Sequence, residues 1–335
     1  MPSNLVRPTR QARLDLLGAL QGYYAIEILV QLHKLGILKL LEKPKTARRL
    51  AELLGLNGRM LDCLLQFVAR STDLFECSNG SYSLKSGSSA QMRFQLEKFS
   101  CAYAPSLQHI ARLLRKNKAP RVDDLALARA FASFEESGEP VATMARKAGV
   151  KRLLDLGCGP AWLLVALAGA DPRFEGFGID KSRAMCRVAR RNVRQTVQDS
   201  RIHIKAGDAR RPEKLLSAVQ RSGIEAVHGS SFLNEFFASG ENGVIEVLRH
   251  LRRQFPGRIA WFVDYYGELG SERGRLRQHR LTLLQDVAQI ASLQGVPPSR
   301  LQDWERIHKK AGCRLMEVQE FQSDEIIWFI HTVQF

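Results

Sequence analysis

Three carboxylates follow short apolar runs between residues 150 and 208 of this 335-residue sequence. Asp155 begins a turn that contains Gly157 and Gly159, Asp180 ends the stretch FGID, and Asp208 ends the stretch AGD. In a parallel sheet built from strand and helix units, the carboxyl ends of the strands meet at one edge, where such folds bind ligands. We therefore expect the three carboxylates to line one binding site.

The turn after the first of these strands indicates which nucleotide cofactor the site suits. A dinucleotide needs a third glycine where this chain has Trp162, and an anion such as Asp155 beside its pyrophosphate would disfavour binding. S-adenosylmethionine instead carries a sulfonium and an ammonium group, which a strand-end carboxylate attracts. Asp180 can then accept both ribose hydroxyls, and Asp208 with the following Ala209 suits the adenine. The predicted cofactor-binding residues are Asp155, Gly157, Gly159, Asp180, Asp208 and Ala209.

A second set of candidate residues follows the expected fourth and fifth strands. Asn234 and Glu235 lie in the stretch SSFLNEF, residues 230–236. An amide is not basic, so Asn234 cannot remove a proton. Glu235 can act as a base if its pKa is raised or if its target is already acidic. Together with Tyr266, these two residues are predicted to form the catalytic site.

Three further residues are candidates for contact with the substrate. Tyr265, which like Tyr266 follows Asp264, suits an aromatic wall around a cation, and the alternative is that both rings pack a loop. His228 lies on the expected fourth strand, where a hydrogen-bonded core histidine is the competing interpretation. Tyr24 either closes the same pocket or belongs to the core. The sequence contains no Cys/His pattern that would indicate a metal site.

These residues need a sheet to position them, and the sequence from Val150 onward predicts one. Short apolar runs alternate with helical stretches, a pattern typical of an α/β domain with a mainly parallel sheet. The last two strands are expected to form an antiparallel pair at the C-terminal edge. The seven expected strands are residues 150–156, 174–180, 201–206, 224–230, 258–264, 313–321 and 325–333.

The first third of the chain is predicted to be mainly helical and to contain a winged helix. Residues 46–54 and 58–70 carry leucines at helical spacing, and Gly55 lies where the first of these helices would end. Asn79 and Gly80 separate two short strand-like runs, which is a strong signal for a hairpin. Helix, turn, helix and hairpin in this order are typical of a winged helix.

Winged helices often bind DNA, but this one lacks the side chains for it. The second helix carries only Arg59 and Arg70 against Asp62, whereas a helix that reads the major groove needs several exposed Arg, Lys, Asn or Gln. The interpretation that we favour is a dimerisation or lid module.

The change of pattern along the chain predicts three parts. They are a helical winged-helix domain at residues 1–118, a helical connector at 119–148 and a catalytic domain at 149–335. A hinge is expected at residues 116–120, where the sequence reads KNKAP.

The chain is basic, with 50 Lys and Arg against 34 Asp and Glu and a formal net charge of +16. Residues 181–215 contain eleven Lys or Arg and three acids. A solvated helix face is the simpler interpretation of this segment. A nucleic-acid methyltransferase is an alternative, although the Asn/Asp-Pro-Pro-aromatic turn typical of base-methylating enzymes is absent, and an acidic carrier protein could also dock here.

The cysteines and the hydropathy of the sequence indicate the cellular compartment. The six cysteines are widely separated, without a CxxC pair, which indicates neither a disulfide framework nor a zinc site. The sequence has no signal-peptide-like run and no apolar stretch of membrane-spanning length. We expect a soluble, cytoplasmic protein.

These motifs together resemble the class I S-adenosylmethionine-dependent methyltransferases, in particular the small-molecule O-methyltransferase branch with an N-terminal winged-helix dimerisation domain. The resemblance rests on the winged helix at residues 46–84, on LDLGCG at 154–159, GID at 178–180 and GD at 207–208, and on Trp304 ahead of KAGC at 310–313. It implies a Rossmann-like seven-stranded sheet preceded by a helical domain, a small-molecule substrate and a homodimer formed through the N-terminal domain.

Two departures from the family pattern bear on the reaction. Ala161 replaces the usual third glycine, which adds a methyl group near the methionine end of the cofactor. The family usually carries a His-Asp or His-Glu pair after the fourth strand, and here Asn234 and Glu235 occupy the matching stretch.

We therefore predict methyl transfer from S-adenosylmethionine to a small metabolite by in-line displacement, without a membrane or nucleic-acid partner. The alternative is a cyclase that consumes S-adenosylmethionine, releases methylthioadenosine and forms azetidine-2-carboxylate. A winged-helix regulator that binds the cofactor without catalysis is a third interpretation.

Overall fold

The chain folds into two compact units, Met1–Leu96 and Glu97–Phe335. The computed structural model describes residues 14–85, 89–116, 122–132, 138–196, 201–269, 279–323 and 325–335. The predicted domain boundary between residues 118 and 119 lies outside the described residues, as does most of the predicted hinge. Within the described residues, no helix combines the length and the apolar character that crossing a bilayer requires.

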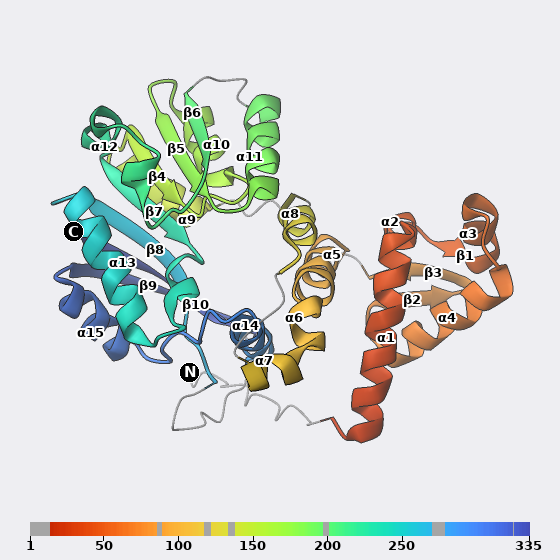
Figure 1. The fold of residues 1–335 in the computed structure, drawn as a ribbon. Helices are drawn as coiled ribbons and strands as arrows, with labels where there is room; N and C mark the ends of the chain where they lie inside the picture. Colours follow the sequence, from red (N-terminus) through yellow and green to blue (C-terminus); the bar gives the residue numbers. More distant parts are fainter. Residues whose placement is uncertain are drawn as a thin grey trace, which may run out of the picture. The chain divides into compact units, whose positions relative to one another are not determined.

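The first unit contains the predicted succession of helix, helix and hairpin (Figure 1). Thr46 accepts a hydrogen bond from the amide of Arg49 and so caps the first of these helices. The hairpin turns at Asn79 and Gly80, whose φ angles of 49° and 71° explain why these residue types occur there. Its elements are α1 (Leu16–Lys34), α2 (Ile37–Leu40), β1 (Lys45–Thr46), α3 (Ala47–Leu54), α4 (Gly58–Ser71), β2 (Phe75–Ser78), β3 (Ser81–Leu84) and α5 (Ser89–Gln95), with a small sheet in the order β1-β3-β2.

The second unit is built on a seven-stranded sheet in the order β6-β5-β4-β7-β8-β10-β9. The first five of its strands in sequence pair in parallel, and β10 pairs antiparallel with both β8 and β9. This confirms the predicted sheet and its antiparallel edge. The strands are β4 (Arg152–Leu156), β5 (Glu175–Asp180), β6 (Ile202–Ala206), β7 (Ala226–Ser230), β8 (Ile259–Tyr265), β9 (Arg314–Gln322) and β10 (Ile327–Gln334).

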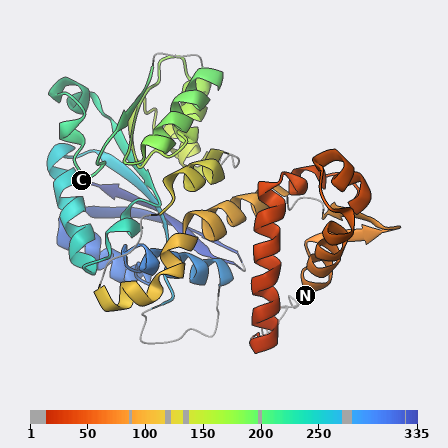
Figure 2. The same cartoon turned by 45° about the vertical axis from the view of Figure 1, so that its right-hand side comes forward.

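Helices cover both faces of this sheet, because its strands are apolar on both sides (Figures 1 and 2). One face packs against α9 (Glu139–Lys147), α10 (Trp162–Ala170) and α11 (Arg183–Thr196), and the other against α13 (Glu241–Gln254) and α15 (Leu301–Ala311). The other helical elements of the unit are α6 (Ala104–Gln108), α7 (Ile110–Lys116), α8 (Asp124–Ala132), α12 (Ala218–Gly223), α14 (Arg280–Ala291), the 3₁₀ turns Pro212–Lys214 and Leu233–Phe236, and the π-helical segment Leu96–Ala102 at its start.

Candidate functional site

The turn between β4 and α10 runs through three residues in the left-handed region. Gly157, Gly159 and Ala161 have φ angles of 69°, 51° and 64°. The amides of Gly157 and Cys158 both donate to the carbonyl of Ile179 on β5, at 2.8 and 3.1 Å, and hold the turn against the sheet. Left-handed geometry explains the two glycines, since a side chain is unfavourable there.

The outer surface of this turn leaves space for a ligand close to the backbone. A Cβ atom built on Gly159 would meet no atom within 4 Å, and one built on Gly157 would meet only the Phe232 ring at 3.6 Å. Gly178 differs, because a Cβ atom there would lie 2.8 Å from Cys158 Sγ and from Ile204 Cδ1. Gly178 therefore serves close packing beneath the turn, while the other two glycines leave its outer surface open.

Ala161 does not expose its methyl group. The residue is fully buried in the core cluster of α9, α10 and the sheet, where its neighbours include Leu164. A left-handed conformation costs a non-glycine residue roughly 1–2 kcal/mol, so the turn holds local strain here. The departure at this position is accommodated in the core beneath the turn.

Asp155, the first of the three carboxylates, has a histidine partner. Asp155 and His228 are opposite each other on β4 and β7, and Asp155 Oδ1 lies 2.7 Å from His228 Nδ1. Both side chains are buried, with 3% and 5% of their residue surfaces exposed. His228, predicted as a substrate-binding residue, therefore orients Asp155 from the neighbouring strand.

Asp180 connects the end of β5 to the glycine turn. Its Oδ2 accepts the amide of Gly159 at 3.0 Å, and its Oδ1 accepts the amide of Ser182 at 2.8 Å. Burial raises its pKa to about 6, against the opposing effect of these two amides. Each carboxylate oxygen has a second lone pair, so Asp180 can still accept hydroxyl groups from a ligand on the turn.

Asp208, at the end of β6, forms an ion pair with Arg210. The guanidinium contacts both carboxylate oxygens, with Nε 2.9 Å from Oδ1 and Nη2 2.8 Å from Oδ2. These hydrogen bonds lower the pKa of Asp208. The following Ala209 is buried in the core. The pairing holds Asp208 in a defined orientation after the end of β6.

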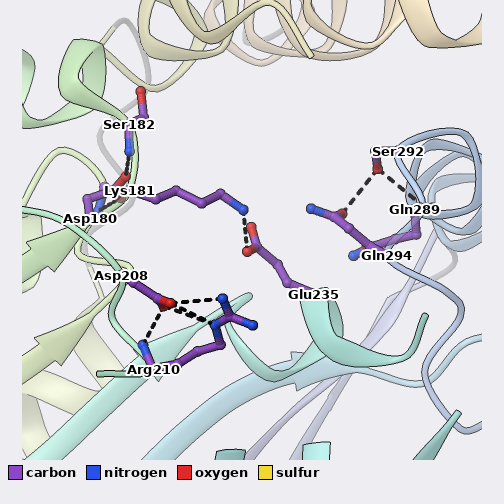
Figure 3. Close-up of polar contacts among 10 residues, drawn as sticks. Asp180, Lys181, Ser182, Asp208, Arg210, Glu235, Gln289, Ser292 and Gln294 are labelled. Atoms are coloured by element: carbon purple, nitrogen blue, oxygen red, sulfur yellow. Dashed lines mark hydrogen bonds and ion pairs between the residues drawn. The ribbon is translucent and has the colours of Figure 1, made fainter. Parts of the chain in front are cut away.

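Glu235, after β7, reaches the end of β5 through its contact with Lys181. Its Oε2 lies 2.5 Å from Nζ of Lys181, the residue after Asp180 (Figure 3). Its negative charge adds to burial in raising the pKa of Asp180 and of Asp264, the latter to about 7. It also adds to burial in raising the pKa of Tyr103 to about 12. One carboxylate thus influences groups on three separate segments.

Asn234 is buried beside Glu235 and held through its backbone. Its amide donates to Asp264 Oδ2 at 2.9 Å, and the amide of Tyr265 donates to Asp264 Oδ1 at 3.0 Å. Asp264 therefore joins the segment after β7 to the end of β8. The side-chain Oδ1 of Asn234 has no hydrogen-bond partner among the described residues, although the residue is only 1% exposed.

The two tyrosines at the end of β8 belong to different surroundings. Tyr265 donates its hydroxyl to Asp286 Oδ1 on α14 at 2.9 Å, and burial together with this carboxylate raises its pKa. Tyr266 instead donates to Glu320 Oε1 at 2.6 Å, and its ring packs against Phe329 in the core. The structure thus brings Tyr265 beside Asp264 and places Tyr266 in the aromatic core under α15.

Tyr24 belongs to the first unit. It lies on α1, where 59% of its surface is exposed and its ring contacts Tyr23 edge to face.

The comparisons with known proteins identify the segment that carries these carboxylates. Residues 153–254 match the family model described as a methyltransferase domain. Over these residues, the chain is similar to a methyltransferase domain. No curated protein matches the chain.

Solved structures extend the similarity in fold over almost the whole chain. The mitomycin 7-O-methyltransferase MmcR is 18% identical, with a TM-score of 0.69 over 95% of this chain and 96% of its own. NcsB1, an O-methyltransferase from neocarzinostatin biosynthesis solved with S-adenosylhomocysteine and 1,4-dihydroxy-2-naphthoic acid, is 17% identical, with a TM-score of 0.64 over 96% and 99%. An O-methyltransferase family protein from Burkholderia thailandensis is 15% identical, with a TM-score of 0.65 over 96% and 98%.

Sequence reasoning missed several residues around this candidate site. Lys181 was assigned to the basic surface, yet its amine pairs with Glu235. Tyr103 lies directly before α6 and Asp286 lies on α14, both far from Glu235 in the sequence, and no local motif marks them. For Asp286, the available signal was the set of polar residues at helical spacing in 282–289, which share one side of the helix.

Proposed function

We propose that the protein transfers a methyl group from S-adenosylmethionine to a small metabolite. The observation that carries this proposal is the open glycine turn held by Asp180, because it leaves the backbone accessible where a nucleoside would lie. The similarity to NcsB1, which binds S-adenosylhomocysteine, supports the same cofactor here.

Each residue of the cofactor side has a distinct role in this proposal. Gly157 and Gly159 allow the methionine part to approach the backbone, and Asp155, oriented by His228, attracts its positive charge. Asp180 accepts the ribose hydroxyls. Asp208, fixed by Arg210, faces the adenine. S-adenosylmethionine supplies a methyl group bonded to its sulfonium sulfur, and this sulfur becomes the neutral thioether of the leaving group.

The acceptor side contributes alignment and a proton acceptor. Asp264 fixes the backbone of Asn234, so that the following Glu235 is held by its own segment and by Lys181. We propose that Glu235 takes the proton of the acceptor, and that Asn234 and Tyr265 orient the acceptor for in-line attack. Tyr266 is left out of this group because its contacts are with the core.

Product analysis tests the reaction. The protein is incubated with S-adenosylmethionine labelled in its methyl group and a mixture of small acceptors, and the nucleosides are then separated. S-adenosylhomocysteine together with label in the acceptor is the expected result. Methylthioadenosine without labelled acceptor would contradict methyl transfer and indicate cyclisation or aminocarboxypropyl transfer.

We also propose that the protein is a homodimer formed through its first unit. Large apolar side chains are exposed along α1, including Leu16 and Leu17 at 75% each and Tyr23 and Tyr24 at 59% each. A helix with this much exposed apolar surface is typical of an interface. Light scattering after gel filtration should give twice the chain mass, and Leu17→Glu should shift it to one chain mass. An unchanged mass for this variant would contradict the proposal.

A further inference from the structure

Helix α14 buries its polar side and exposes its apolar side, the reverse of an ordinary surface helix. Its buried side carries four polar residues spaced three and four apart, whereas Leu284, Val287 and Ile290 are 37–53% exposed on the opposite side. A helix in a globular protein normally buries its apolar stripe, so a buried polar stripe calls for a polar partner. The four buried polar residues, none more than 9% exposed, are Thr282, Gln285, Asp286 and Gln289.

Asp286 accounts for the attachment of this helix but not for the other polar groups. It accepts the Tyr265 hydroxyl at 2.9 Å and the amides of Glu268 and Leu269 at 2.7 and 2.8 Å. Thr282 Oγ1 and Gln289 Oε1, by contrast, are buried without a hydrogen-bond partner among the described residues. A buried polar atom without a partner destabilises the protein, and a ligand that supplies the partner would remove this cost.

The buried side of α14 lies next to the acceptor side of the proposed site. Its Asp286 contacts Tyr265, whose neighbour Asp264 holds Asn234. The turn after α14 packs tightly on the same segment, because a Cβ atom on Gly295 would lie 2.2 Å from the carbonyl of Phe237. In the close-up, Gln289 and the turn that follows α14 lie across from Glu235 (Figure 3).

We propose that the buried face of α14 selects the acceptor, and that the acceptor is a small polar molecule with at least two N–H or O–H donors, of the amino alcohol, amino acid or amino sugar kind. Three unpartnered oxygens carry the proposal, on Thr282, Gln289 and Asn234, since each accepts a donor. A flat apolar acceptor would leave all three oxygens buried and unpaired. This inference rests on the proposed methyl transfer and narrows its substrate class.

Stability of the protein without ligands gives the first test. Thr282→Val and Gln289→Met remove the unpartnered atoms with little change of shape, and Val287→Thr is a matched control on the exposed face. Melting temperatures measured by differential scanning fluorimetry should rise by about 2 °C in each of the first two variants and stay unchanged in the control. A fall in the first two variants would overturn the proposal, because it would mean that both atoms already have partners in the free protein.

Acceptor selection gives the second test. With labelled S-adenosylmethionine, ethanolamine, lysine and glucosamine are compared as acceptors with 1-naphthol, a flat acceptor with a single O–H donor. Methylation within the polar group is expected, with KM at least 10-fold higher in Thr282→Val and Gln289→Met and with the Kd of S-adenosylhomocysteine unchanged. Methylation of the naphthol alone, or an unchanged KM, would overturn the inference while methyl transfer stands. Failure of the wild-type protein to bind S-adenosylhomocysteine would instead overturn the proposed function.

Discussion

Replacing Asp180 by asparagine isolates the carboxylate that holds the glycine turn. Asparagine has nearly the same shape but keeps only one acceptor oxygen, so either Gly159 or Ser182 loses the acceptor for its amide. A ligand hydroxyl loses a hydrogen bond to a charged group, which contributes about 1.5–3 kcal/mol. The Kd of S-adenosylhomocysteine should therefore rise roughly 10- to 150-fold.

Titration calorimetry at pH 8 measures this change, since Asp180, with a pKa of about 6, is ionised there. The sign of the pH dependence follows from that pKa: the carboxylate takes up a proton as the pH falls through 6, so the affinity of the wild-type protein should decrease about tenfold by pH 5. The Asn variant should lack this decrease. Asp171→Asn is a matched control, because Asp171 pairs with Lys151 at the amino ends of the strands, whereas Asp180 lies at their carboxyl ends. Equal affinity of wild type and Asp180→Asn at pH 8 would refute the assignment of Asp180 to the cofactor.

Three other predictions follow from contacts in the second unit. In steady-state kinetics, Glu235→Gln should lower kcat for methyl transfer at least 100-fold with little change in cofactor affinity, and Lys181→Met should lower kcat by a smaller factor. An equal kcat in Glu235→Gln and wild type would show that Glu235 is not the proton acceptor. Gly178→Ala should lower the free energy of unfolding in urea by about 1–3 kcal/mol, because the new methyl group meets Cys158 and Ile204. Adding Cys158→Ala should restore part of this loss, and a double variant without any recovery would argue against the contact with Cys158. His308 and His331 are buried side by side, and burial lowers the pKa of His308 to about 4, so the unfolded chain takes up protons near pH 6.5 that the folded chain refuses. The contribution of the neutral His308 to stability should thus be fully present above pH 6.5 and fall by up to about 3 kcal/mol toward pH 4, whereas protonation of Asp180 and Asp264, whose pKa values are raised to about 6 and 7, acts in the opposite direction. The difference in the free energy of unfolding between wild type and His308→Phe, measured in urea, isolates this contribution, and a difference that stays constant from pH 6.5 to pH 4 would contradict it.

Local patterns were sufficient to predict the large sheet and the hairpin of the first unit. Each observed strand of the large sheet lies within two residues of its expected range at either end, because buried strands alternate with helices in a pattern that the chain displays directly. The hairpin at Asn79 and Gly80 was predictable for a similar reason, since positive φ angles restrict which residues occur there.

The partners of the predicted residues could not be predicted in the same way. His228 was considered as a contact for the substrate, yet it bonds Asp155 across two strands that are adjacent only after folding. Tyr265 and Tyr266 are neighbours in sequence, but their hydroxyls reach different carboxylates, on α14 and on β9. Alternation along a strand separates adjacent side chains, and only the packing of other elements determines what each one meets.

The sequence alone determines where the strands of this protein end and which charged residues follow them, because strand periodicity and turn geometry depend on residues that are close in the sequence. Tertiary structure alone decided that Lys181 pairs with Glu235, that Asp264 holds Asn234, and that α14 turns its polar side inward. The first two contacts join residues 54 and 30 positions apart, and the Tyr265–Asp286 contact of α14 joins residues 21 apart. Their energies depend on burial, which no short stretch of sequence specifies.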